Sequence, residues 1–326
     1  MDNLARVQCN EIVQGRGFIY DDITQTIGNT PLVRLSRFAK ALDVSANILA
    51  KIEFFNPAGS IKDRPALAMI EAMIEDGRIG ANTEIIEATS GNNGVACAWI
   101  CAMKKIPLTI VIPEHMSIER RKLIKHYGAN LVLTPREQGT KGAIDTAKRM
   151  IEERDNAIML DQFGNQDNSA MHAKSTAEEI WTDTQGKIDV LVAGIGTGGT
   201  ISGIAKTLKE RNPNLKVVAV EPASCPVLSE GRSGVHKIQG LSSGHVPDIL
   251  RRDLIDEVLT VSDEDAVSFA RDIACLESLP VGISSGAALK ASMIVGQREE
   301  FAGKNIVTIL ADNAERYFST DLFEQD

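Results

Sequence analysis

The sequence has no apolar run that approaches the roughly 20 residues a helix needs to cross a bilayer. Its first residues also lack the apolar centre that is typical of a signal peptide. Basic residues are in short supply: 35 lysines and arginines face 44 aspartates and glutamates, which gives a net charge of −9. A charge of this sign disfavours nucleic acid or an anionic membrane as the main partner. We therefore expect a cytoplasmic protein that binds small molecules at local sites.

Cysteine is also scarce, and its pattern excludes a disulfide framework. The five cysteines are scattered and odd in number, which is typical of a reducing compartment. Cys97 and Cys101 lie one helical turn apart in an apolar stretch, so we expect them to be buried packing residues. The five histidines show no metal-ligand spacing, and no metal site is predicted.

The chain of 326 residues is long enough for two domains, each with its own core. We expect strands at 85–86, 108–112, 131–133, 158–160, 190–193, 217–220, 258–261 and 306–310. Helical patterns alternate with them at 66–74, 94–103, 117–127, 142–153, 168–181 and from 201 onward. This alternation predicts βαβ units and mostly parallel sheets. Ligand-binding residues are expected in the loops that follow the strands.

A glycine-rich loop at residues 194–200 follows one strand and precedes a helix. Its backbone N–H groups and the positive helix end predict a phosphate site. Gly194, Gly196 and Gly199 also satisfy the dinucleotide fingerprint, and Glu221 ends the next strand where a ribose-binding acid could lie. A nicotinamide or flavin enzyme is therefore a competing interpretation.

A lysine follows a tight turn in the segment 51–65. The run Asn-Pro-Ala-Gly predicts the turn, Ser60 can cap it, and an apolar helix starts at the Lys-Asp-Arg sequence that begins with Lys62. The positive helix end and the neighbouring Arg64 would both favour the neutral amine, which is the form that attacks an aldehyde.

A second polar loop, at residues 87–94, lies between a strand and an apolar helix. Its hydroxyl, amide and backbone N–H groups at a helix start predict a carboxylate-binding site. The alternative is a structural N-cap with spare polar residues.

Together these segments resemble the cysteine synthase (O-acetylserine sulfhydrylase) family of fold-type II pyridoxal-phosphate enzymes. The motifs occur in order at 26–32, 56–64, 89–94, 162–163, 196–200, 282–286 and 315–320. The resemblance covers about residues 22–323. It implies an α/β protein of tryptophan-synthase-β-like fold, with two domains that each contain a mostly parallel sheet flanked by helices. The expected division is an extension at 1–20, a mobile domain at 56–165, and a second domain formed by 21–55 and 166–326.

The resemblance also implies roles for individual residues. Lys62 would form the Schiff base with pyridoxal 5′-phosphate and act as the catalytic base. The remaining cofactor contacts would come from Asn92, Gly196, Thr197, Gly198, Gly199, Thr200 and Ser284, with Asn92 at the 3′-oxygen and Ser284 at the pyridine nitrogen. The amino-acid substrate would be bound by Thr89, Ser90, Gly91, Asn93, Gln162 and Gly240.

The reaction implied by the resemblance is a β-replacement that makes L-cysteine from O-acetyl-L-serine and sulfide through an α-aminoacrylate intermediate. Cystathionine β-synthase, lanthionine-forming, hydrogen sulfide-forming and diaminopropionate-type activities remain alternatives in the same class. A more distant alternative is an NAD-dependent oxidoreductase. A third class of function is a cofactor-loaded protein that binds serine acetyltransferase. The family implies a homodimer, and the mobile domain is expected to move toward the second domain when substrate binds.

Four features depart from the family pattern. Asn93 replaces a threonine, 240–245 differs from a glycine-alanine-glycine run, and 311–314 replaces a turn that contains proline and glycine. Mixed motifs leave the A-type or B-type subclass open. His245 is expected to be structural or to sense the nucleophile, and Cys9 lies in an N-terminal arm of unknown role.

Overall fold

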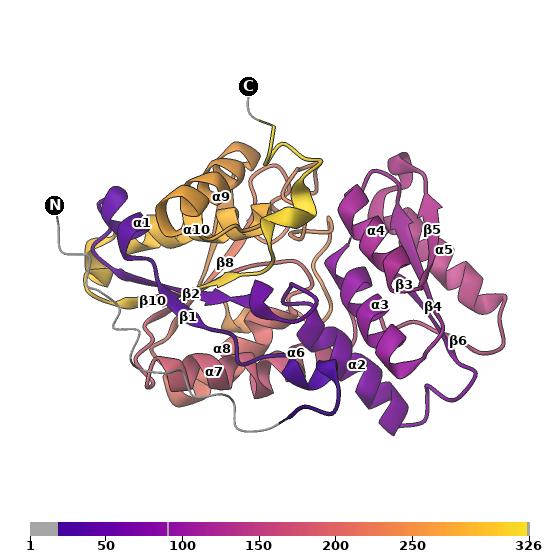
Figure 1. The fold of residues 1–326 in the computed structure, drawn as a ribbon. Coiled ribbons are helices and arrows are strands. Elements are labelled where there is room, and N and C mark those ends of the chain that lie inside the picture. Colours follow the sequence, from indigo (N-terminus) through magenta and orange to yellow (C-terminus); the bar gives the residue numbers. More distant parts are fainter. Residues whose placement is uncertain (1–18, 90, 325–326) are drawn as a thin grey trace.

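The computed structural model describes residues 19–89 and 91–324, and it contains two separate β-sheets (Figure 1). The smaller sheet has four strands in the order β5-β4-β3-β6, and the larger has six in the order β1-β2-β10-β7-β8-β9. Every strand pair is parallel except β1–β2. This confirms the predicted α/β class with mostly parallel sheets.

The smaller sheet consists of β3 (Glu84–Ala88), β4 (Leu108–Pro113), β5 (Asn130–Thr134) and β6 (Ala157–Ile158). Helices α2 (Asp63–Glu75), α3 (Asn92–Lys104) and α4 (Ile118–His126) share a core with one face of this sheet. Helix α5 (Gly139–Glu152) covers the other face. Successive residues of β3 alternate between the two cores, since Ile85 belongs to one and Ile86 to the other. Burial on both faces explains why β4, which is buried along its whole length, is mostly apolar.

The larger sheet consists of β1 (Leu32–Arg34), β2 (Asn47–Ile52), β7 (Val190–Gly194), β8 (Lys216–Pro222), β9 (Glu257–Val261) and β10 (Asn305–Leu310). Helices α1 (Ser36–Ala41), α9 (Asp263–Glu277) and α10 (Ile283–Gly296) pack on one face. Helices α7 (Thr176–Asp183) and α8 (Gly199–Arg211) pack on the other. Helix α6 (Gln166–Lys174) lies between α8 and α2, so it joins the layers around the two sheets. No helix of the described residues is long and apolar enough to span a membrane.

The expected elements differ from the structure in three places. The single helix expected at 168–181 is two helices, because the backbone of Ser175 (φ −123°, ψ −70°) leaves the helical region between α6 and α7. Strand β6 has two residues and ends before residue 160. The antiparallel β1–β2 pair was not foreseen, since β1 is only three residues long and mostly exposed.

The expected burial of Cys97 and Cys101 is confirmed. Cys9 lies outside the described residues. The smaller sheet falls within 84–158, but the domain boundaries proposed from the sequence stay a prediction.

Candidate active site

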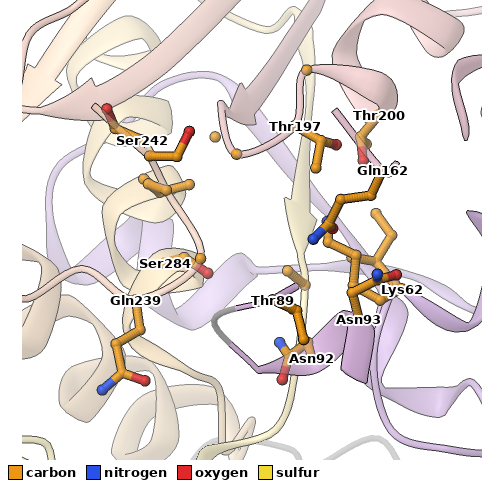
Figure 2. A pocket seen from close by; sticks show the side chains of 18 of the residues that line it. Lys62, Thr89, Asn92, Asn93, Gln162, Thr197, Thr200, Gln239, Ser242 and Ser284 are labelled. Atoms are coloured by element: carbon orange, nitrogen blue, oxygen red, sulfur yellow. The ribbon is translucent and has the colours of Figure 1, made fainter. Parts of the chain in front are cut away.

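A cavity of about 210 Å³ lies between the loops that follow strands of both sheets. Its walls contain residues that follow the carboxyl ends of β3, β7 and β10, which is where open α/β sheets bind ligands. Figure 2 shows Lys62 and Gln162 on one side of the open space, with Ser284 and Ser242 on the opposite side. Residues more than 200 positions apart in the sequence therefore share one site.

Lys62 is the N-cap residue of α2 and lines the cavity. The turn before it is fixed to the end of β10, because the Ile61 N–H donates to the Ala311 carbonyl oxygen (2.8 Å) and Ser60 pairs with Asp312. The Ser60 hydroxyl accepts from the Lys62 N–H at 3.2 Å. Burial lowers the pKa of the Lys62 amine, although the negative charge of Asp312 acts in the opposite direction. The neutral amine expected from the sequence is thus favoured, with burial as the cause.

Arg64, which we expected to act on Lys62, is committed elsewhere. Its guanidinium is fully buried and pairs with Glu53 at 2.8 Å and Glu179 at 2.7 Å. Lys51, also fully buried, lies 2.8 Å from the same Glu179. The expected contribution of Arg64 is wrong, since the lowered pKa of Lys62 results from burial, and, among the described residues, the one charge that acts on it is Asp312.

The glycine loop leads from β7 into α8, and Gly198 at its N-cap has a left-handed backbone (φ +81°). A Cβ atom on Gly196 would lie well inside 3.0 Å of the Gly240 carbonyl oxygen. Only glycine lets the loop approach the neighbouring chain so closely. The hydroxyl of Thr197 accepts from the amide of Asn168 at 3.1 Å. The N–H groups at the start of α8 and this oriented hydroxyl form a cradle for a phosphate.

A buried histidine, His172, forms a hydrogen bond with a residue of the same loop. The Nε2 atom of His172 lies 3.2 Å from the hydroxyl of Thr200, and its Nδ1 atom lies 2.9 Å from that of Thr176. Burial lowers the pKa of His172 well below its usual value, and the positive charges of Arg64 and Lys62 act in the same direction. His172 and Asn168 come from α6, and sequence reasoning missed both, because a polar residue on a helix gives no local sign of which loop it will face.

A hydrogen bond joins the end of β3 to the start of α3, on either side of the polar loop. The Asn93 amide nitrogen donates to a carboxyl oxygen of Glu87 at 3.2 Å. The other carboxyl oxygen accepts from the backbone of Leu160 and Asp161. Burial raises the pKa of Glu87 to about 8, although these backbone donors act against it. The residue that departs from the family threonine is thereby fixed in orientation.

Ser284 lies in the first turn of α10 on the opposite wall. Its hydroxyl lies 3.5 Å from the position a Cβ would take on Gly240. Within the part of the chain that the structure describes, this hydroxyl has no hydrogen-bond partner. It is therefore available to a ligand.

Most predicted site residues line this one cavity. They are Lys62, Thr89, Asn92, Asn93, Gln162, Gly196, Thr197, Gly198, Thr200, Gly240 and Ser284. Gly91 and Gly199 do not line it, and Ser90 lies outside the described residues. The structure brings these residues together, while their individual roles stay predictions.

Two residues singled out in the sequence lie away from the expected chemistry. The Glu221 carboxylate is buried and accepts from the backbone of Leu228 (2.8 Å) and Ser229 (3.0 Å). It is thus occupied by a structural loop, which removes the ribose contact that the dinucleotide interpretation required. The ring of His245 lies beside that of Phe163, with centroids 5.4 Å apart and the planes tilted by 52°, and His245 is not among the lining residues.

Residues 23–312 match the family model described as "Pyridoxal-phosphate dependent enzyme". The chain is 46% identical over 305 residues to "Cysteine synthase B" of Campylobacter jejuni, across 94% of this chain and 99% of the relative. It is similar to the crystal structure of a cysteine synthase from Entamoeba histolytica, with a TM-score of 0.93, 40% identity and coverage of 97% and 94% of the two chains. A hydrogen sulfide-producing enzyme from Fusobacterium nucleatum gives a TM-score of 0.88, 40% identity and coverage of 92% and 100%. The range matched by the family model contains every residue that lines the cavity.

Proposed function

The chain belongs to the family of pyridoxal-phosphate-dependent enzymes, and from that premise we propose that it is a cysteine synthase that makes L-cysteine from O-acetyl-L-serine and sulfide. One observation carries the proposal: the half-buried amine of Lys62 and four residues of the glycine loop, Gly196, Thr197, Gly198 and Thr200, line the same cavity. An oxidoreductase using a nicotinamide cofactor gives no role to that amine.

The cavity suits pyridoxal phosphate in three respects. The glycine loop offers N–H groups at the start of α8 to a phosphate, Lys62 is held toward its neutral form, and the hydroxyl of Ser284 is free to contact a ring nitrogen. When bound, this cofactor withdraws electrons from the substrate Cα, which permits loss of the Cα proton and of a β-substituent.

Individual residues of the chain then have separate roles in the reaction. Lys62 is the catalytic base: its neutral Nζ takes the proton from Cα and later returns it. A serine at position 284, in place of a carboxylate, leaves a ring nitrogen largely unprotonated. That choice weakens electron withdrawal, disfavours transamination and racemisation, and still permits loss of a good leaving group such as acetate.

The substrate carboxylate is assigned to the loop after β3. Thr89 lies there, Asn93 lies in the first turn of α3, and the first N–H groups of α3 supply further donors. Gln162 approaches from the other end of the cavity wall, as Figure 2 shows. These groups orient the amino acid and exclude water from its β-carbon when the smaller domain, at 56–165, closes on the larger one.

A substrate matrix tests this function. The purified holoprotein would be mixed with O-acetyl-L-serine, L-serine or O-phospho-L-serine, and then with sulfide, homocysteine or cysteine, while products are identified by mass spectrometry. Cysteine and acetate should form fastest from O-acetyl-L-serine and sulfide. If serine or phosphoserine reacts and O-acetyl-L-serine does not, the named substrate is wrong.

A related β-replacement activity that releases hydrogen sulfide is the second candidate. It is favoured by the similarity to the Fusobacterium enzyme of that description and by Asn93 in the carboxylate loop. If the holoprotein is mixed with cysteine alone, this activity would appear as release of sulfide.

We further propose a cytoplasmic homodimer, with the domain division given above, that is able to bind serine acetyltransferase. The acidic composition and free cysteines support the compartment. Light scattering of the purified protein, alone and with a serine acetyltransferase, tests the assembly: a monomer that does not shift in mass would contradict it.

A further inference from the structure

A hydrogen-bonded group of six polar residues, four of them buried, crosses from the helices of the smaller sheet to the loops of the larger one. We call it the interdomain cluster; it consists of Asn92, Arg120, Gln239, Asp312, Arg316 and Tyr317. Asn92 begins α3 and Arg120 lies in α4, whereas the other four follow β8 or β10. Asn92, Arg120 and Gln239 also line the cavity, so the cluster forms part of its wall.

Both polar atoms of the Asn92 side chain are engaged in this cluster. The amide nitrogen donates to Oδ2 of Asp312 at 2.6 Å. The amide oxygen accepts from Nε of Arg120 at 3.0 Å and from Nη1 of Arg316 at 2.9 Å. In Figure 2, Asn92 and Gln239 lie along the same edge of the cavity. The orientation of the Asn92 amide is therefore set by charged groups from both sides of the domain boundary.

Arg120 uses its whole guanidinium in the cluster although it lies on a helix rich in surface charge. It is 2% exposed, and beyond Asn92 it donates to Gln239 and lies 3.5 Å from the Asp312 carboxylate. It also stacks over the Tyr317 ring, 4.5 Å from the centroid. A planar guanidinium can make these contacts at once, whereas a lysine amine cannot.

Asp312 supplies the only carboxylate of the cluster. Its Oδ2 accepts from Asn92 and, at 2.7 Å, from the hydroxyl of Tyr317. It balances two buried guanidinium groups: burial lowers the pKa of Arg316, and the charge of Asp312 opposes that change. The other charged groups that face this region are Asp63 and Lys62, on the lysine turn. Loss of the Asp312 charge would leave Arg120 and Arg316 repelling each other across the boundary.

We propose that Arg120 and Asp312 are positioning residues that hold α3 and α4 against the loops of the larger sheet and so fix Asn92 at the cavity wall. Arg120 also lines the cavity, but the proposed effect of both residues is on the position of Asn92. Substrate binding then depends on a latch between the domains as well as on the carboxylate loop itself. The kinetic part of this inference rests on the proposed cysteine synthase function, while the structural part does not.

Hydrogen–deuterium exchange of the full-length holoprotein tests the latch without any assay of activity. In Arg120→Lys and Asp312→Asn, amides of α4 and of residues 311–317 should exchange at least about fivefold faster than in the wild type, because local opening loses its restraint. Glu119→Gln is the matched control, since Glu119 bonds Ser319 across the same boundary but touches no member of the cluster. Unchanged exchange in both cluster variants, or equal acceleration in the control, would overturn the proposal.

Steady-state kinetics separates positioning from general damage. Each cluster variant should raise KM for the amino-acid substrate at least about fivefold with a smaller change in kcat, and the double variant should be no worse than the poorer single one. Tyr317→Phe, which keeps the ring under Arg120 and removes one bond to Asp312, should give an intermediate KM and serves if Asp312→Asn does not fold. Additive effects of the two single changes would refute a shared latch. A wild type inactive on O-acetyl-L-serine would refute the function and leave the exchange result standing.

Discussion

Gly196→Ala is the sharpest single perturbation of the cofactor cradle. The added Cβ would lie well inside 3.0 Å of the Gly240 carbonyl oxygen, and this obstacle is backbone that cannot rotate away. Overpacking of this kind costs about 1–3 kcal/mol. Gly240 and Ser284 are neighbours in the cavity wall. A shift of Gly240 would therefore displace residues that the cofactor is expected to contact. When this strain is present only in the cofactor-bound protein, the affinity for pyridoxal phosphate should fall by roughly 5- to 150-fold.

The assay is a titration of the apoprotein with pyridoxal phosphate, followed by absorbance, together with thermal unfolding of the apoprotein. Gly80→Ala is the matched control, because the only atom near its added Cβ is the Thr83 hydroxyl at 3.9 Å. Its affinity and melting temperature should equal those of the wild type. Wild-type cofactor affinity in Gly196→Ala would refute the assignment of this loop to the phosphate.

Three other changes test neighbouring parts of the account. Lys62→Ala should fold and still bind the cofactor but lose at least about 10³-fold in turnover; retained β-elimination would contradict its role as base. His172→Ala should weaken cofactor binding roughly tenfold by freeing the hydroxyl of Thr200, whereas unchanged binding would make His172 a packing residue only. The third change concerns Glu179. Burial alone would raise the pKa of this carboxylate, but its bonds to Arg64 and Lys51 lower that pKa to about 2. The stability this carboxylate contributes is present above its ordinary pKa of 4.5 and is lost as pH falls from there toward 2. Chemical denaturation of Glu179→Gln should therefore show a smaller loss of stability between pH 5 and pH 3 than the wild type, and identical losses would contradict the ion pair's role.

Local sequence signals were enough to place the lysine and the phosphate loop. The turn before Lys62 and the glycines at 194–199 each dictate their own backbone, and the alternation of strands and helices brings loop ends to one edge of each sheet. The burial of Lys62 depends on packing between domains, so the sequence suggested the correct direction of its pKa shift with Arg64 as a wrong cause.

Residues that act across long separations could not be found in this way. Arg120 lies close to the exposed Lys122 in a helix whose charges resemble an ordinary solvated face. Only the fold brings it to Asp312, 192 positions later. The sequence indicated that the segment 311–314 departs from the family pattern. The contacts of Asp312 with Asn92 and Arg120 could be identified only from the folded structure.

Borohydride reduction of the holoprotein, followed by peptide mass spectrometry, tests the central claim most directly. The account predicts that the yellow colour is lost and that one reduced pyridoxyl phosphate group is attached to Lys62, while Lys51 and every other lysine stay unmodified. A colourless protein, or the group found on a different lysine, would contradict it.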